Sequence, residues 1–258
     1  TSIYVIGIYS SNNDATSLLN TSVGITVSST GGRNEYITIT GNTVQNVHVG
    51  IFIRGFNHLS SPYDFYDQNI TIGSAGAGNT IQNFGGNSGA AYGIYQISQN
   101  NIKIAYNTIN NTAGVGTSAN GLIYGILSGA GINSNIDIYE NNINLTSAGN
   151  TQAAYGISNI TGGSGTDNTV NIYNNTVTIN YTTATSAGLI AIQSTAAAYN
   201  VNIYNNIITN CQLGGSATAT ATGQFTGIGI SGSNTNSGSH GKVYNNTISN
   251  NSRVQSTP

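Results

Sequence analysis

The acidic residues come first, because few other groups in this chain could perform chemistry. The 258 residues include seven carboxylates: Asp14, Glu35, Asp64, Asp67, Asp137, Glu140 and Asp167. Hydrolysis of a glycosidic bond uses two carboxyl groups about 5–10 Å apart, and a calcium-dependent lyase would need a cluster that holds Ca²⁺. Most of these acids lie in different repeats, so we expect no catalytic residues and no enzyme activity.

No motif for binding a metal or a cofactor is evident in the sequence either. His48, His58 and His240 are scattered, and Cys211 is the only cysteine, so neither a zinc spacing nor an internal disulfide arises. We expect no cofactor and no metal. Lys103 and Asp137, in turn, are expected to form a surface ion pair, which contributes little.

One segment, residues 56–68, breaks the repeat and gathers aromatic and acidic side chains. Its candidate ligand-binding residues are Tyr63, Asp64, Tyr66 and Asp67. They could form a ligand or Ca²⁺ loop, but a loop packed on its own aromatic side chains explains them as well. We favour the self-packed loop.

A tyrosine column is the second candidate for ligand binding. Its members take the same position in four successive repeats: Tyr139, Tyr173, Tyr204 and Tyr244. Aromatic rings along a flat sheet can bind sugar rings, and they can also stack on one another and stabilise the sheet. Both interpretations stay open. Tyr92, Tyr124 and Tyr155 belong to another motif and are interpreted as packing residues.

The elements that position these residues follow from two alternating motifs. The first is apolar-x-apolar, a key Asn and a β-branched residue, as in the run from Val170 to Val177. Its key Asn residues are Asn42, Asn79, Asn107, Asn141, Asn175, Asn206 and Asn246. The second motif is a Gly-Ile strand, as in Tyr124-Gly125-Ile126. Periodic strand motifs of this kind indicate a solenoid.

The motifs predict an all-β, single-stranded, right-handed parallel β-helix of about seven coils. Each coil has roughly 34 residues and three short strands, and residues 1–258 form one domain with the loop insertion at 56–68. The key Asn is expected at a sharp turn, because Asn tolerates the left-handed conformation. Its amides are expected to bond from coil to coil as an asparagine ladder. The many glycines are interpreted as turn and strand-end residues.

The amino-acid composition argues against some classes of binding partner. Charged residues make up 5% of the chain and the net charge is −2, so there is no basic surface for nucleic acid. No apolar run reaches the length of a membrane span, so we expect no membrane insertion. A Thr-Ala-Thr-Ala-Thr run at 218–222 suggests ice binding, but we discount it because the run is a single loop segment and not a Thr column repeated across coils.

The Tyr-Asn-Asn-Thr-Val and Tyr-Asn-Asn-Thr-Ile runs, in motifs that alternate with the Gly-Ile strands, resemble right-handed parallel β-helix repeat proteins of the large secreted or surface adhesin type in bacteria. The resemblance implies an extracellular or cell-surface location and a structural or adhesive role. The same fold also carries polysaccharide-processing enzymes, so carbohydrate binding or processing is the alternative, with a glycan as partner. No cap motif is evident at either end, so we expect head-to-tail self-association into a filament, or flanking coils of a longer chain.

Overall fold

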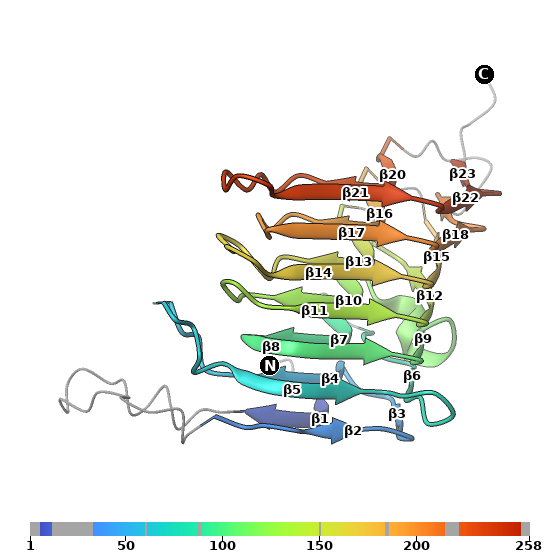
Figure 1. Cartoon of the computed structure of the whole chain (residues 1–258). Helices are drawn as coiled ribbons and strands as arrows, with labels where there is room; N and C mark the ends of the chain where they lie inside the picture. The colour runs from blue at the N-terminus through green and yellow to red at the C-terminus, as the bar shows by residue number, and fades with distance from the viewer. Residues whose placement is uncertain are drawn as a thin grey trace.

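The chain winds into a parallel β-solenoid with three sheets (Figure 1). The computed structural model describes residues 6–11, 33–59, 61–86, 89–149, 151–183, 186–214 and 222–253. Asp14 and most of the run at 218–222 lie outside these residues. The described helical structure is a single 3₁₀ turn, η3 (Gly114–Ser118), and every strand pair is parallel, so the predicted fold class is confirmed.

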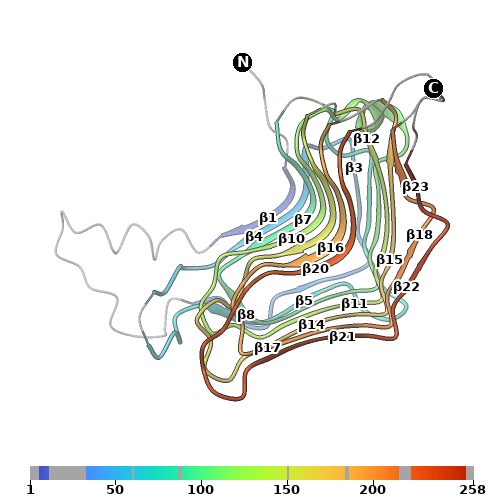
Figure 2. The same ribbon diagram turned by 90° about the horizontal axis from the view of Figure 1, so that it is seen from above.

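Each sheet takes one strand from every coil. Sheet A has the order β1 (Ile6–Ser11), β4 (Val49–Arg54), β7 (Ala91–Ile97), β10 (Ile123–Gly129), β13 (Ala154–Asn159), β16 (Leu189–Ser194) and β20 (Phe225–Ile230). Sheet B has the order β2 (Thr38–Ile39), β5 (Asp67–Ile72), β8 (Gln99–Ala105), β11 (Ile136–Tyr139), β14 (Thr169–Tyr173), β17 (Asn200–Tyr204) and β21 (His240–Tyr244). Seen along the axis, the two sheets form two of the three sides of the cross-section (Figure 2).

The third side, sheet C, also runs the length of the stack. Its order is β3 (Thr43–Gln45), β6 (Thr80–Gln82), β9 (Thr108–Asn110), β12 (Asn142–Ser147), β15 (Thr176–Tyr181), β18 (Ile207–Thr209) and β22 (Thr247–Ser249), extended by β19 (Gln212–Leu213) and β23 (Ser252–Arg253). The coil count needs a correction. About five turns, rather than seven, are stacked between neighbours on both sides, because the first and last strands of each sheet are edge strands.

The loop insertion is also shorter than expected. β5 begins at Asp67, so the inserted segment ends at Tyr66 and not at residue 68. The last predicted loop residues therefore already belong to sheet B, where Asp67 pairs with Gln99 of β8.

The core is a set of aligned apolar columns. In sheet B, the register joins Ile72, Ile104, Ile138, Ile172 and Ile203, all fully buried. The intervening residues face outward: Lys103 is exposed, whereas Asp137, Asn171 and Asn202 are half-buried. The strand period of two thus holds at these positions of the sheet.

The Gly of the Gly-Ile motif has a different role from the one predicted. It lies within the strands of sheet A and faces the core, where a Cβ on Gly125 would lie 2.6 Å from the Ile143 Cγ2 of sheet C. The equivalent distance is 2.5 Å from Gly93 to Ile109. Glycine is therefore favoured here, because a Cβ would approach both the side chain from sheet C and a carbonyl oxygen of the neighbouring strand. Sheet A bends at this point (Figure 2).

We expect Ile138→Ala to lower the free energy of unfolding by about 2–5 kcal/mol, because it leaves a cavity between Ile104 and Ile172. Lys103→Ala, on an exposed position of the same sheet, should change it by less than about 0.5 kcal/mol. Denaturant unfolding followed by circular dichroism measures both. Equal effects would show that the register is wrong.

We expect Gly125→Val to destabilise the solenoid by about 1–3 kcal/mol or more through overpacking against Ile143. Valine is a stricter test than alanine, because one coil already has an alanine, Ala191, at this position. Gly163→Val is the control, since nothing lies within 4 Å of a Cβ built there. Thermal unfolding compares the two, and a neutral Gly125→Val would contradict the close approach of the sheets.

Candidate functional site: stacked columns and the open last coil

The asparagine ladder joins neighbouring coils along the edge between sheets B and C. Each Asn donates its backbone N–H and its Nδ2 to the Oδ1 of the next Asn, at 2.9–3.1 Å from Asn42 through Asn246. Nδ2 also donates to a carbonyl of the preceding coil, as Asn141 does to the Ile104 oxygen at 2.8 Å. The interior ladder amides are at most 2% exposed, and they satisfy their hydrogen-bonding capacity within the column.

The turn chemistry differs from the prediction. The left-handed residue is the one that precedes the ladder Asn, for example Asn174 (φ 54°) before Asn175 and Asn205 (φ 55°) before Asn206. Gly41, Tyr106, Glu140 and Asn245 take the same conformation. The ladder Asn is therefore required for its side-chain bonds, and the residue before it carries the backbone turn.

The two ends of the ladder are chemically different. In the first coil, the Oδ1 of Asn42 receives no hydrogen bond from the described residues, although its Nδ2 donates to Thr40 and Asn79. In the last coil, Asn246 donates Nδ2 to the carbonyls of Ile203 and Tyr244, but its backbone N–H has no acceptor in the described part of the chain. One end thus offers an acceptor and the other a donor.

The ends also differ in how far their apolar side chains are exposed. Ile39 and Val44 of the first coil are each 8% exposed, whereas Val243 and Ile248, in the same two columns of the last coil, are 51% and 50% exposed. Hollows of about 380 Å³ and 200 Å³ open beside β20, the first lined by Phe225 and Ile248. The C-terminal face is therefore an open core with unpaired strand edges.

The predicted tyrosine column forms a continuous stack on sheet B. Successive centroids from Tyr139 through Tyr173 and Tyr204 to Tyr244 lie 4.9, 4.9 and 5.0 Å apart, with interplanar angles of 1–3°. Tyr106 closes the lower end with its edge toward Tyr139. The rings cover one another's faces, so only Tyr244, 43% exposed, has a free face for a sugar ring.

The stack changes the acidity of its phenols. Burial, followed by the nearby Asp137 carboxylate and the neighbouring phenols, raises the pKa of Tyr173 to about 12. The pKa values of Tyr139 and Tyr204 are also raised, again mainly by burial. These hydroxyls stay protonated and act as hydrogen-bonding groups rather than bases at neutral pH.

A second aromatic group, on sheet A, was not predicted as a surface. Phe52, Tyr92, Tyr95, Tyr124 and Tyr155 are all half-buried. Their rings stack with centroids 4.6–5.2 Å apart. Because residues 93 and 94 are both buried, Tyr92 and Tyr95 share the outer face of the bent sheet. A spacing of three between aromatic residues around a buried Gly-Ile pair is the signal that could have revealed this group.

The inserted segment packs against itself and its neighbours. The Tyr66 hydroxyl donates to the His58 carbonyl at 2.7 Å and accepts from the Ile132 N–H at 2.8 Å. His58 stacks on Phe65 at 4.3 Å, and buried Asp67 accepts two hydrogen bonds from Asn34. Tyr66 and Asp67 are thus fully buried and unavailable to a ligand, whereas Tyr63 and Asp64 remain half-exposed.

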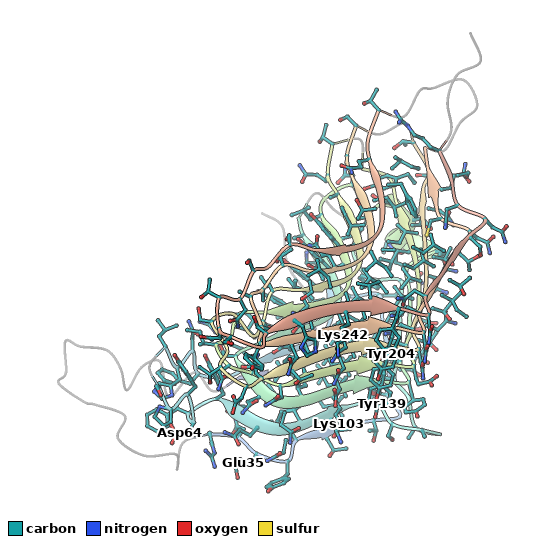
Figure 3. The ribbon with its side chains drawn as sticks, turned by 45° about the horizontal axis from the view of Figure 1, so that its top comes forward. Glu35, Asp64, Lys103, Tyr139, Tyr204 and Lys242 are labelled. Atoms are coloured by element: carbon teal, nitrogen blue, oxygen red, sulfur yellow. The ribbon has the colours of Figure 1, made fainter. Side chains whose placement is uncertain are left out.

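The carboxylates that the structure describes are not gathered into one site. Glu35 pairs with Arg33 and lies near Asp64, whereas Tyr139 and Tyr204 lie on a different part of sheet B (Figure 3). The described residues show no ion pair between Lys103 and Asp137; Asp137 instead accepts from Asn171 at 2.9 Å. Within the described ranges, no group of three or more His, Cys, Asp or Glu residues could hold a metal ion.

Sheet C carries a threonine column at residues other than the run at 218–222. The outward register joins Thr43, Thr80, Thr108, Asn142, Thr176, Ile207 and Thr247. At five of the seven ladder positions the Thr directly follows the ladder Asn, so the motif that predicted the ladder also contains this column. Asn142 and Ile207 interrupt it, so it is not a regular hydroxyl array.

Comparisons with protein-family models, curated proteins and solved structures find no match. The described part of the chain also has no helix that is long and apolar enough to cross a membrane.

We expect the free energy of unfolding to fall as pH rises from about 10 to about 12. Unfolded tyrosine loses its proton near 10.0, whereas Tyr173 holds its proton to about 12 in the fold, so the unfolded state binds fewer protons in this window. Tyr173→Phe should reduce the fall, and Tyr36→Phe, at an exposed position, should not. Unfolding at several pH values tests this, and a slope that Tyr173→Phe leaves unchanged would contradict it.

Proposed function

We propose that this chain is a non-catalytic, extracellular structural or adhesive β-solenoid that is extended by a further β-coil on its C-terminal face. The observation that carries the proposal is the open last coil. Val243 and Ile248 are half exposed there, and an edge with bare apolar residues is a site for strand addition.

Three features support a structural role. The ladder and the stacked rings strengthen contacts between coils, and dispersed carboxylates offer no acid–base pair. A surface with so few charges suits packing against a neighbouring solenoid. The extracellular location rests on the repeat resemblance, with its Asn- and Gly-rich composition of 40 Asn and 34 Gly.

The alternative is a carbohydrate-binding solenoid. The aromatic groups on sheets A and B favour it, since aromatic side chains are common in sugar sites. Mutual stacking leaves ring edges and hydroxyls, rather than faces, for contact with a glycan, so this alternative ranks second.

We expect the chain to associate with rising concentration, and the double variant Val243→Thr/Ile248→Thr to associate less. Threonine keeps the β-branch but lowers the apolar area on the open face. Ile207→Thr is the matched control, because Ile207 is 44% exposed on the outer face of sheet C. Sedimentation velocity and light scattering measure the association.

A strictly monomeric wild-type chain would contradict the proposal. An equal effect of Ile207→Thr on association would also contradict it, because it would indicate non-specific hydrophobic association and not a specific contact at the open face.

A further inference from the structure

We infer that the coil received by the C-terminal face is the first coil of a second copy, with Asn42 of that copy continuing the ladder from Asn246. The inference rests on the proposed extension of this face and names its partner and register. Strands β1, β2 and β3 of the second copy would pair with β20, β21 and β22. This contact is heterologous and does not close, so it builds a filament.

The ladder supplies the first argument. At every interior step, the Oδ1 of one Asn accepts both the N–H and the Nδ2 of the preceding Asn. Asn246 has the unused N–H, and Asn42 has the unused Oδ1. Two C-terminal faces would bring donors against donors, so the ladder favours head-to-tail over tail-to-tail contact.

Backbone conformation supplies the second argument. Residues 37–46 and 241–250 align without a gap, and both place left-handed residues just before the ladder Asn and four positions after it. Gly41 (φ 69°) and Asn46 (φ 58°) correspond to Asn245 (φ 53°) and Asn250 (φ 56°). Of the positions four after the other ladder Asn residues, only Asn83 and Asn210 share the second turn. The first coil therefore fits the last better than the third, fourth or fifth coil would.

The side-chain columns continue in the same register. Val243 would meet Ile39, and Ile248 would meet Val44, so apolar residues lie on apolar residues. On the outside, Thr247 would meet Thr43, and Ser249 would meet Gln45, as uncharged polar neighbours. Ile39 and Val44 are only 8% exposed, so the contacts that bury them must rearrange before a second copy can pair there. The junction should therefore be weaker than a contact between coils of one chain.

The test is a cysteine pair across the junction. Opposed residues on neighbouring strands lie about 4.8 Å apart, within the Cα separation of about 4.4–6.8 Å that a disulfide allows. Gln45→Cys/Ser249→Cys places both thiols in one predicted column. Thr38→Cys/Ser249→Cys is the mismatched control, because Thr38 lies on sheet B and Ser249 on sheet C. The native Cys211 is buried and its pKa is raised to about 11, so we expect it not to form a disulfide in the folded protein. Reaction of Cys211 would show that the chain has unfolded.

After mild oxidation, we expect the matched variant to give a ladder of covalent dimers, trimers and longer oligomers on a non-reducing gel. The mismatched variant should lose this ladder. Cross-linking of Ser249→Cys alone would indicate tail-to-tail contact and overturn the inference.

Two further outcomes separate the inference from the proposed function. Association without the matched cross-link would leave the extended C-terminal face standing and reject this partner coil. A monomeric chain with no cross-link would reject both.

Discussion

The structure depends on the side-chain hydrogen bonds of one asparagine per coil. Each interior ladder amide spans three coils, because it accepts from the coil before, donates to the coil after and also donates to a carbonyl of the coil before. Amide groups this deeply buried are costly when unpaired, so each Asn fixes the height and register of its neighbours. The sheets on either side inherit that register, which places isoleucine on isoleucine and tyrosine on tyrosine.

Close contact between sheets A and C is the second constraint. Isoleucine or valine side chains from sheet C fill the space that a side chain on sheet A would need, so sheet A keeps glycine at most of these positions. The bend that follows turns two successive residues inward, and it places Tyr92 and Tyr95 together on the outer face. The concave shape and its aromatic group are thus consequences of packing in the core.

The sequence predicted the columns well, because alternation with a period of two is a local signal. The apolar-x-apolar positions of the first motif and the ladder asparagines were both identified from it. Contacts between sheets were harder, since nothing near Gly125 in sequence shows that Ile143 lies against it. The Lys103–Asp137 pair was predicted from register alone, and it fails because the amide of Asn171 bonds Asp137 instead.

The unequal spacing of the ladder shows how little the loops matter to the stack. Successive ladder asparagines are 28 to 40 residues apart, yet their hydrogen bonds stay within 2.9–3.1 Å. Length and composition of the corners are therefore free to change while the coils keep their contacts. A solenoid of this kind can acquire new surface segments at its corners by insertion, as it has between β4 and β5, without repacking its core.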